Sequence, residues 1–164
     1  MNKGYNSIKA NLAQDLLNKL RKEVHPKFFE QIVGRFLKKM GYGEYEETSY
    51  TNDGGIDGII HQDQLGLEKI FFQAKRYDEG NNVTSSQLRD FVGTLDTKGV
   101  TKGVFITTSK FPKDPEEKIG KTPKSIIFID GPEFAKLMIQ YNVGVTTEDT
   151  YEIKKIDEDF FTED

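Results

Sequence analysis

Three polar residues with complementary chemistry lie close together in the sequence: Asp57, Gln73 and Lys75. A carboxylate and an amide oxygen are ligands for hard divalent cations, and an ammonium group can hold a water molecule or an anion beside them. Gly54 and Gly55 precede Asp57 and permit a backbone bend that a side chain would resist. If folding brings the three side chains together, they can hold a divalent metal and a water.

Two apolar segments would position these residues. Residues 56–62 and 69–77 are rich in β-branched or aromatic side chains, which favours strands, and the Gln-Leu-Gly-Leu stretch between them is typical of a turn. The pattern therefore predicts an antiparallel hairpin. We place the centre of its turn between Leu65 and Gly66.

The register of this hairpin decides which residues meet. A turn with that centre would put Asp57 opposite Ala74. Side chains alternate across a strand, so Gln73 and Lys75 would share one face while Ala74 points to the other. We therefore expect Asp57 to lie beside the Gln73–Lys75 segment. The alternative is that Asp57 and Lys75 form only a structural cross-strand ion pair, worth about 0.2–1 kcal/mol.

Composition limits the kind of protein and the kind of metal site. A length of 164 residues with 35% hydrophobic and 30% charged content indicates one globular unit with its own core. The chain has no cysteine and only two histidines, so a metal would take oxygen ligands, which favours Mg²⁺, with Mn²⁺ as a substitute, over zinc. There is no apolar run of membrane-spanning length and no signal sequence at the N-terminus, so we expect a cytoplasmic protein with no membrane association.

The distribution of charge is uneven. A net charge of −4 argues against binding nucleic acid through bulk positive charge. Residues 148–164 hold eight acidic and two basic side chains, however, and the rest of the chain is close to balanced. A local basic rim is therefore compatible with the composition, with candidates at Lys75, Arg76, Arg89, Lys98, Lys102 and Lys110.

Helical patterns surround the hairpin. Residues 5–23 carry leucines and isoleucine on one helical face, and His25-Pro26 interrupts this helix before a second one that runs to about Gly41. The remaining pattern predicts a strand at 44–51 and a helix at 85–98, which Ser85 or Ser86 would cap. After a buried strand at 102–108 we expect a loop or short helix at 110–124, a second buried strand at 125–130, a helix at 132–141 and a last strand or extended tail. This order predicts an α/β sandwich, a central mixed β-sheet flanked by helices.

Four polar residues allow both a functional and an ordinary interpretation. Glu30 lies at the flank of an apolar helical stripe, where boundary carboxylates are common. Asp53 is a possible metal ligand, although Asn-Asp-Gly-Gly is also a turn composition. His61 shares a strand face with Asp57, but a lone histidine at a strand end is usually solvated. Ser109, with the two threonines before it, either binds phosphate or caps the next turn.

The start of helix 85–98 is a further candidate site. Gln87 and Arg89 lie near its N-terminus, and helix N-termini attract phosphate groups. A solvated helix face is the equally ordinary alternative.

At these residues the sequence resembles a known family. Gly-Gly-Ile-Asp-Gly-Ile-Ile followed by Gln-Ala-Lys-Arg is similar to the catalytic domain of Mrr-type restriction endonucleases, a branch of the PD-(D/E)xK nuclease superfamily. The likeness extends through Phe-Phe-Glu-Gln-Ile-Val at 28–33, Met-Gly-Tyr-Gly at 40–43, Gly-Val-Phe-Ile-Thr-Thr-Ser at 103–109 and Ile-Asp-Gly at 129–131. It covers roughly residues 25–161, and the pieces are specific because they occur in the right order over one domain length.

This resemblance implies a restriction-endonuclease-like fold and a Mg²⁺-dependent endonuclease that hydrolyses phosphodiester bonds of double-stranded DNA. By analogy with the family, Asp57, Gln73 and the Ala74 carbonyl would bind the metal, Lys75 would hold the attacking water, and Glu30 would complete the site. The superfamily pattern has Asp or Glu where this chain has Gln73, an exchange found in Mrr-like members. The products would carry 5′-phosphate and 3′-hydroxyl ends.

The resemblance also implies a restriction system that acts on modified, methylated DNA. The rival hypothesis is a catalytically weakened, nuclease-like module for DNA binding or assembly, which Gln73 and the acidic net charge favour. Candidate DNA contacts are Arg76, Gln87, Arg89 and Ser109. The sequence does not reveal the target sequence or the modified base.

Domain organisation follows from the same comparison. We expect an N-terminal amphipathic helix or linker remnant at 1–24 and a catalytic domain with an acidic C-terminal tail at 25–164. Mrr-like proteins usually carry a DNA-recognition winged-helix domain ahead of the nuclease, and this chain has no room for one, so that domain would be separate or missing. A homodimer through the apolar stripe at Ile8, Leu12, Leu16, Leu17 and Leu20 is a further expectation.

Overall fold

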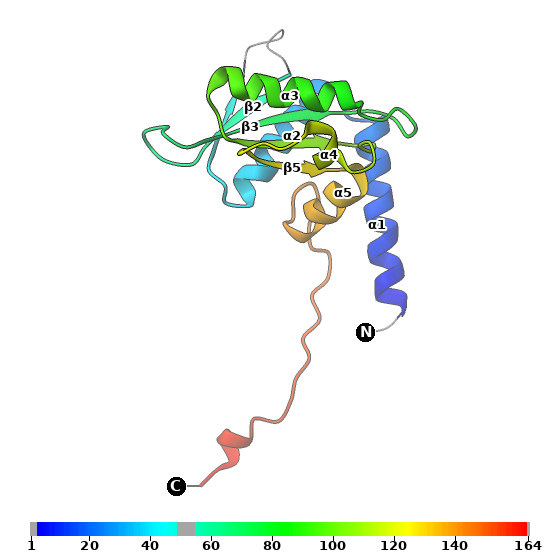
Figure 1. Ribbon diagram of the computed structural model, residues 1–164. Helices are drawn as coiled ribbons and strands as arrows, with labels where there is room; N and C mark the ends of the chain where they lie inside the picture. Colours follow the sequence, from blue (N-terminus) through cyan, green and yellow to red (C-terminus); the bar gives the residue numbers. More distant parts are fainter. Residues whose placement is uncertain (1–2, 49–54, 164) are drawn as a thin grey trace.

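A mixed β-sheet forms the middle of the protein in the computed structural model, which describes residues 3–48 and 55–163 (Figure 1). Its five strands lie in sequence order, namely β1 (Glu44–Glu47), β2 (Gly58–His61), β3 (Lys69–Lys75), β4 (Lys102–Thr107) and β5 (Ser125–Ile129). The first three strands pair antiparallel, and β3, β4 and β5 pair parallel. The predicted α/β sandwich around a mixed sheet is confirmed.

Helices cover both faces of the sheet. One apolar core packs the sheet against α1 (Lys3–Lys22), α2 (Pro26–Lys39) and α5 (Gly131–Gln140). The opposite core lies beneath α3 (Ser85–Lys98), with the short α4 (Pro115–Ile119) beside that helix. A 3₁₀ turn, η1 (Glu158–Phe161), follows much later in the chain. None of the helices in the described part of the chain is long and apolar enough to cross a membrane.

Strand β3 contributes to both cores because its side chains alternate. Phe72 and Ala74 are buried in the core on the α2 side, whereas Phe71 is buried in the core beneath α3. Gln73 and Lys75 follow Phe71 with a period of two, so they project toward α3. The expectation that Gln73 and Lys75 share a face is confirmed by the cleft that both residues line.

The register of the β2–β3 hairpin differs by one residue from the expected one. Gly58 pairs with Phe72, and continuing this register puts Asp57 opposite Gln73 rather than Ala74. The loop explains the difference, because the Asp63 carboxylate accepts hydrogen bonds from the main-chain N–H groups of Leu67 and Glu68, both at 2.9 Å. This turn is centred on Leu65, and a slip of one residue changes every cross-strand partner.

The helix boundaries follow local capping chemistry. Pro26 occupies the first turn of α2, and the side chain of His25 accepts a hydrogen bond from the N–H of Lys27. Helix α3 has the predicted range, but its N-cap is Thr84 rather than Ser85 or Ser86, since Thr84 and Gln87 form a reciprocal capping box.

Helix α1 is only partly packed on the domain. Leu16, Leu17 and Leu20 are buried in the core with α5 and α2, whereas Ile8 is 70% exposed and Leu12 is 41% exposed. The apolar stripe expected to form a dimer surface is therefore split. Its C-terminal half stabilises this domain, and its N-terminal half extends beyond it (Figure 1).

The chain leaves the domain after α5. Val143 and Val145 are the last apolar residues packed against the core. Residues 146–163, here called the C-terminal arm, then run away from the body of the molecule as extended chain that includes η1 (Figure 1). Of the two expected alternatives, a last strand or an extended tail, the described residues show the extended tail.

Candidate active site

Asp57 is fixed at the start of β2 by its own backbone and by β3. Its N–H donates to the carbonyl of Phe72 at 2.9 Å, and its carboxylate Oδ2 accepts from the N–H of Ala74 at 2.7 Å. Gly58 makes this approach possible, because a Cβ at that position would lie 2.2 Å from the ring of Phe72. The carboxylate is thus held beside the C-terminal end of β3.

The surroundings of Asp57 disfavour a negative charge. Burial raises the pKa of Asp57 to about 7, and the neighbouring Glu30 carboxylate acts in the same direction. The N–H of Ala74 and the ammonium group of Lys75 oppose this shift. Two neighbouring carboxyl groups are a common arrangement at oxygen-ligand metal sites.

Gln73 supplies a buried oxygen beside this pair. Gln73 is only 5% exposed, and among the described residues no donor reaches the side-chain oxygen Oε1. Gly55 is required here, since a Cβ on Gly55 would lie 2.1 Å from Nε2 of Gln73. A buried amide oxygen without a donor is costly, and a cation or a water bound at this oxygen would remove the cost.

The main chain of Ala74 also faces Asp57. The N–H and C=O of one strand residue point to the same side, and the N–H of Ala74 points to the Asp57 carboxylate. The carbonyl of Lys75 points the other way and accepts from Thr107 Oγ1 at 2.9 Å and from the N–H of Thr108 at 3.2 Å. The Ala74 carbonyl therefore also points to the Asp57 side, where it can join the oxygen set.

Glu30 reaches the Asp57 carboxylate from α2. Two neighbours of Glu30, Lys27 and Tyr45, were not among the residues predicted from the sequence. Lys27 lies 3.2 Å from the Glu30 carboxylate and 3.1 Å from that of Glu47. The Tyr45 hydroxyl is buried with no partner among the described residues, and burial raises the pKa of Tyr45 to about 12. The spacing of Lys27 and Glu30 on one helical face was the available signal for the first of these contacts.

The donor set fits a hard divalent cation of modest affinity. Among the described residues no three acidic, histidine or cysteine side chains converge. A cation here would therefore depend on the amide oxygen of Gln73 and the carbonyl of Ala74 as well as on carboxylates.

A cleft of about 600 Å³ opens on the α3 side of these residues. Its walls are Gly55, Gln73 and Lys75 from the hairpin and Gln87, Arg89, Asp90, Gly93, Thr94 and Thr97 from α3. The structure thus brings Gln87 and Arg89 to the same cleft as Lys75. The α3 residues from Asp90 to Thr97 were missed in the sequence, although they recur on one helical face.

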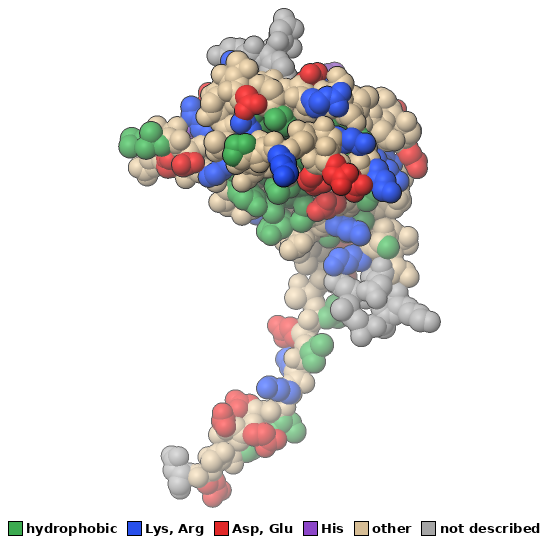
Figure 2. All heavy atoms as spheres, in the orientation of Figure 1, with side chains coloured by type: hydrophobic (Ala, Val, Ile, Leu, Met, Phe, Trp, Pro, Cys, Tyr) green, Lys and Arg blue, Asp and Glu red, His purple; other side chains and the backbone are tan. Residues whose placement is uncertain are grey.

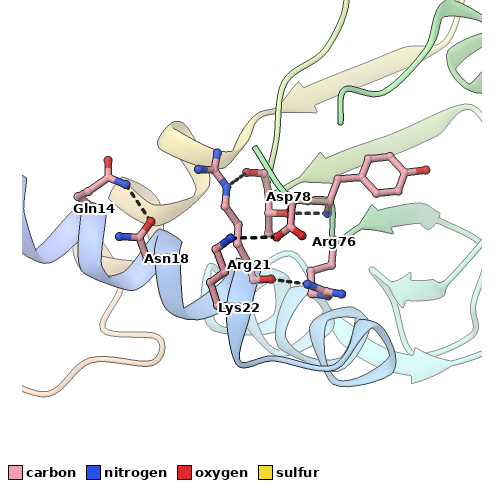
Figure 3. A network of polar contacts seen from close by, with 8 residues as sticks. Gln14, Asn18, Arg21, Lys22, Arg76 and Asp78 are labelled. Atoms are coloured by element: carbon pink, nitrogen blue, oxygen red, sulfur yellow. Dashed lines mark hydrogen bonds and ion pairs between the residues drawn. The ribbon is translucent and has the colours of Figure 1, made fainter. Parts of the chain in front are cut away.

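Two sequence candidates lie away from this cleft. Arg76 donates from Nη1 to the main-chain carbonyl of Arg21 at the end of α1, and Arg21 donates from Nε to the carbonyl of Thr108 at 2.8 Å (Figure 3). Ser109 is 1% exposed, and its hydroxyl lies 3.2 Å from that of Thr107. The positions of Arg76 and Ser109 do not support the expected DNA contacts, because both side chains are used within the domain.

The other polar candidates have structural partners or lie outside the described residues. The Thr108 hydroxyl donates to the carbonyl of Tyr77 at 2.6 Å, as expected for a residue that stabilises a turn. His61 contacts the carboxylate of Glu46 across β1 and β2. Asp53 and Gly54 lie outside the described residues.

Comparison with protein families and curated proteins identifies a restriction endonuclease family. The Mrr_cat model, which describes restriction endonucleases, matches residues 21–138. The type IV methyl-directed restriction enzyme EcoKMrr of Escherichia coli (strain K12) is 37% identical over 154 residues, which cover 92% of this chain and 49% of that protein. The chain therefore spans about half the length of this curated relative.

Solved structures share the fold. The DNA modification-dependent restriction endonuclease AspBHI superposes with a TM-score of 0.65 at 20% identity, over 82% of this chain and 37% of that one. The MspJI restriction endonuclease in complex with a 27-mer oligonucleotide gives a TM-score of 0.58 at 25% identity, over 84% of this chain and 33% of that one.

Proposed function

This chain belongs to the Mrr family of restriction endonuclease catalytic domains, and from that premise we propose that it is a divalent-metal-dependent endonuclease domain acting on double-stranded DNA. The observation that carries the proposal is the buried Oε1 of Gln73, which no donor reaches among the described residues. Gln73 lies on the strand beside the Asp57 carboxylate and shares its face with Lys75. Because the relative EcoKMrr is methyl-directed, the substrate would be modified DNA in a restriction system. Such a role belongs in the cytoplasm.

Asp57, Gln73 and the Ala74 carbonyl would hold Mg²⁺, or Mn²⁺ in its place, and Glu30 would complete the set. The bound ion would supply Lewis-acid polarisation and charge neutralisation at the phosphate. Gly55 keeps the Gln73 amide in place, and the N–H of Ala74 orients the Asp57 carboxylate. These fixed contacts support a preorganised oxygen set at the end of β3.

Lys75 is the residue we assign to the attacking water. It lines the cleft and lies close enough to Asp57 to lower that carboxyl's pKa. From this position the ammonium group would orient the water and stabilise the charge that develops on the phosphate. Removal of a single such group typically costs about 100-fold or more in rate.

The DNA backbone would run along the cleft beside the N-terminal half of α3. Arg89 is exposed there, and a helix N-terminus favours anionic groups. Gln87 has a second task, because it completes the α3 cap and donates to the Tyr77 hydroxyl at 2.8 Å. We therefore assign phosphate contact first to Arg89 and Lys75. Recognition of the modified base would belong to a separate winged-helix domain.

A plasmid-cleavage assay tests this function. The parent chain should cleave supercoiled methylated plasmid with Mg²⁺ or Mn²⁺ and not with EDTA, and Asp57→Ala and Lys75→Ala should each lower the rate about 100-fold or more. Lys113→Ala, an exposed residue away from the cleft, is the matched control and should cleave like the parent.

The same assay addresses the rival function. A parent chain that binds duplex DNA but cleaves it no faster than the Lys75→Ala variant would support a weakened nuclease-like binding module, which the neutral Gln73 and the net charge of −4 favour. Equal cleavage by all of the proteins would show that the catalytic residues lie elsewhere.

A further inference from the structure

The C-terminal arm exposes more apolar surface than a solvated tail requires. Its large apolar side chains are mostly exposed to solvent: Tyr151 89%, Ile153 100%, Ile156 68%, Phe160 77% and Phe161 68%. The rings of Phe160 and Phe161 pack against each other, with centroids 5.0 Å apart. Exposed apolar groups gathered in this way mark an interaction site.

The arm is also strongly acidic. Residues 148–164 contain eight acidic and two basic side chains, and Figure 2 shows acidic and apolar groups interspersed along the arm. A receptor for this segment would combine apolar walls with positive charge at its edge.

The same chain carries a surface of that kind between α1 and α5. A groove of about 720 Å³ is lined by the apolar side chains of Ile8, Leu12, Ala13 and Ile139, and Lys9 and Lys136 also line it. Residues 3–14 of α1 contain two lysines and no acidic residue. This groove uses the half of the α1 stripe that the domain core leaves exposed.

We propose that this groove binds the C-terminal arm of a second copy of the chain, so that two copies exchange arms reciprocally. The apolar arm residues around Phe160 fill the groove, and the arm's carboxylates meet Lys9 and Lys136. Each copy offers one arm and one groove, so a two-fold dimer satisfies both at once.

The direction of the arm favours a second copy over the arm's own groove. The arm runs away from the domain after Val145, and its far end lies well away from α1 (Figure 1). Docking in its own groove would require a reversal of the chain within residues 146–157. That segment contains no glycine, proline, asparagine or serine, and Asp149 and Asp157 are its residues of the types that most often form tight turns.

The oligomeric state in solution tests the exchange without any measurement of DNA cleavage. Sedimentation of the full chain at roughly 100 µM should give a dimer. This concentration detects dimers with Kd values into the micromolar range. Truncation after Val145 removes the arm and keeps the packed core, and it should give a monomer. Leu12→Glu should weaken the dimer at least tenfold, whereas Leu65→Glu, at an 85% exposed position in the β2–β3 loop, should leave it unchanged.

Mixing provides the decisive control. A Leu12→Glu chain keeps its arm, and a Phe160→Ser/Phe161→Ser chain keeps its groove. Each variant alone should dimerise more weakly than the parent. Mixed together, the two should form a dimer through the one junction in which both the arm and the groove are intact. Lys9→Glu/Lys136→Glu should also weaken the dimer, and added salt should weaken the parent.

Three results would overturn the proposal. They are a monomeric full chain, a dimer that survives removal of the arm, and a monomer whose arm resists proteolysis because it has closed on its own groove. None of these results bears on whether Asp57 and Lys75 cleave DNA.

Discussion

Gln73 is the residue that sets the affinity of the proposed metal site. A neutral amide oxygen attracts a hard cation less than a carboxylate does. We predict that Gln73→Glu binds Mg²⁺ and Mn²⁺ about tenfold more tightly or better and cleaves DNA at least as fast as the parent. Titration calorimetry measures the binding, with Gln14→Glu on the exposed part of α1 as the control. Weaker Mn²⁺ binding by Gln73→Glu would show that this side chain does not face the metal.

Asp57 should make the stability of the metal-free protein depend on pH. Burial raises the folded-state pKa of Asp57 to about 7 from an ordinary value of 3.8, so the folded protein holds a proton that the unfolded chain has released between these values. Its contribution to the free energy of unfolding is therefore fully present below pH 3.8 and is lost as the pH rises through about 7.

Asp57→Asn tests this dependence. We predict that the variant is more stable than the metal-free parent at pH 8 by roughly 1–3 kcal/mol and similar to it at pH 4. Saturating Mg²⁺ should stabilise only the parent at pH 8. Urea unfolding at the two pH values measures the difference, and a difference that does not change with pH would contradict the assigned pKa.

At the scale of elements, the sequence predicted what local periodicity decides. The alternation along β3 and the apolar stripes of the helices predicted the strand and helix order. The structure places the Asp57 carboxylate at the N–H of Ala74, between Gln73 and Lys75 in the sequence, and their role as a site stays a prediction. The one-residue error in register arose because side-chain bonds of Asp63 to the loop backbone set the turn. Periodicity carries no information about such bonds.

The misplaced site residues have a different physical cause. Arg76 follows Lys75 directly in the sequence, and only the packing of α1 against the end of the sheet reveals that Arg76 reaches Arg21. The same packing buries Ser109. Whether a polar residue after a strand faces a cleft or the interior depends on elements distant in the sequence.

Gly55, which precedes β2, offers a test of how the backbone positions Gln73. Gly55 has φ 85°, and a Cβ there would meet the Gln73 amide, whereas Gly80 has φ 88° with no atom within 4 Å. Gly55→Ala and Gly80→Ala should share a backbone penalty of about 1 kcal/mol. Only Gly55→Ala should also displace Gln73 and reduce Mn²⁺ affinity about tenfold or more, as calorimetry would show. Equal effects of the two substitutions would remove Gly55 from the site.

For the whole molecule, the uneven charge has a consequence for DNA binding. Residues 148–164 hold eight acidic and two basic residues, so the other 147 residues hold 21 basic and 19 acidic ones. We predict that the chain truncated after Val145 binds duplex DNA several-fold more tightly than the full chain in low salt, and that the difference shrinks as salt screens the arm. Fluorescence anisotropy measures both affinities.

A second variant separates charge from the loss of the arm. Replacing the acidic residues of the arm with their amides keeps its apolar side chains and should raise DNA affinity nearly as much as truncation does. If only truncation raises the affinity, the arm obstructs DNA sterically and its charge is not the cause.

The place of β3 in the sheet also determines how the site responds to thermal fluctuation. This strand is hydrogen-bonded to β2 on one side and to β4 on the other, and it is the point where the antiparallel and parallel halves of the sheet meet. Its amide hydrogens should therefore exchange with solvent only through global unfolding, more slowly than those of β1 or β5. Gln73 and Lys75 would stay in position while the edges of the sheet open and close, so substrate could enter past a moving rim without disturbing the catalytic groups.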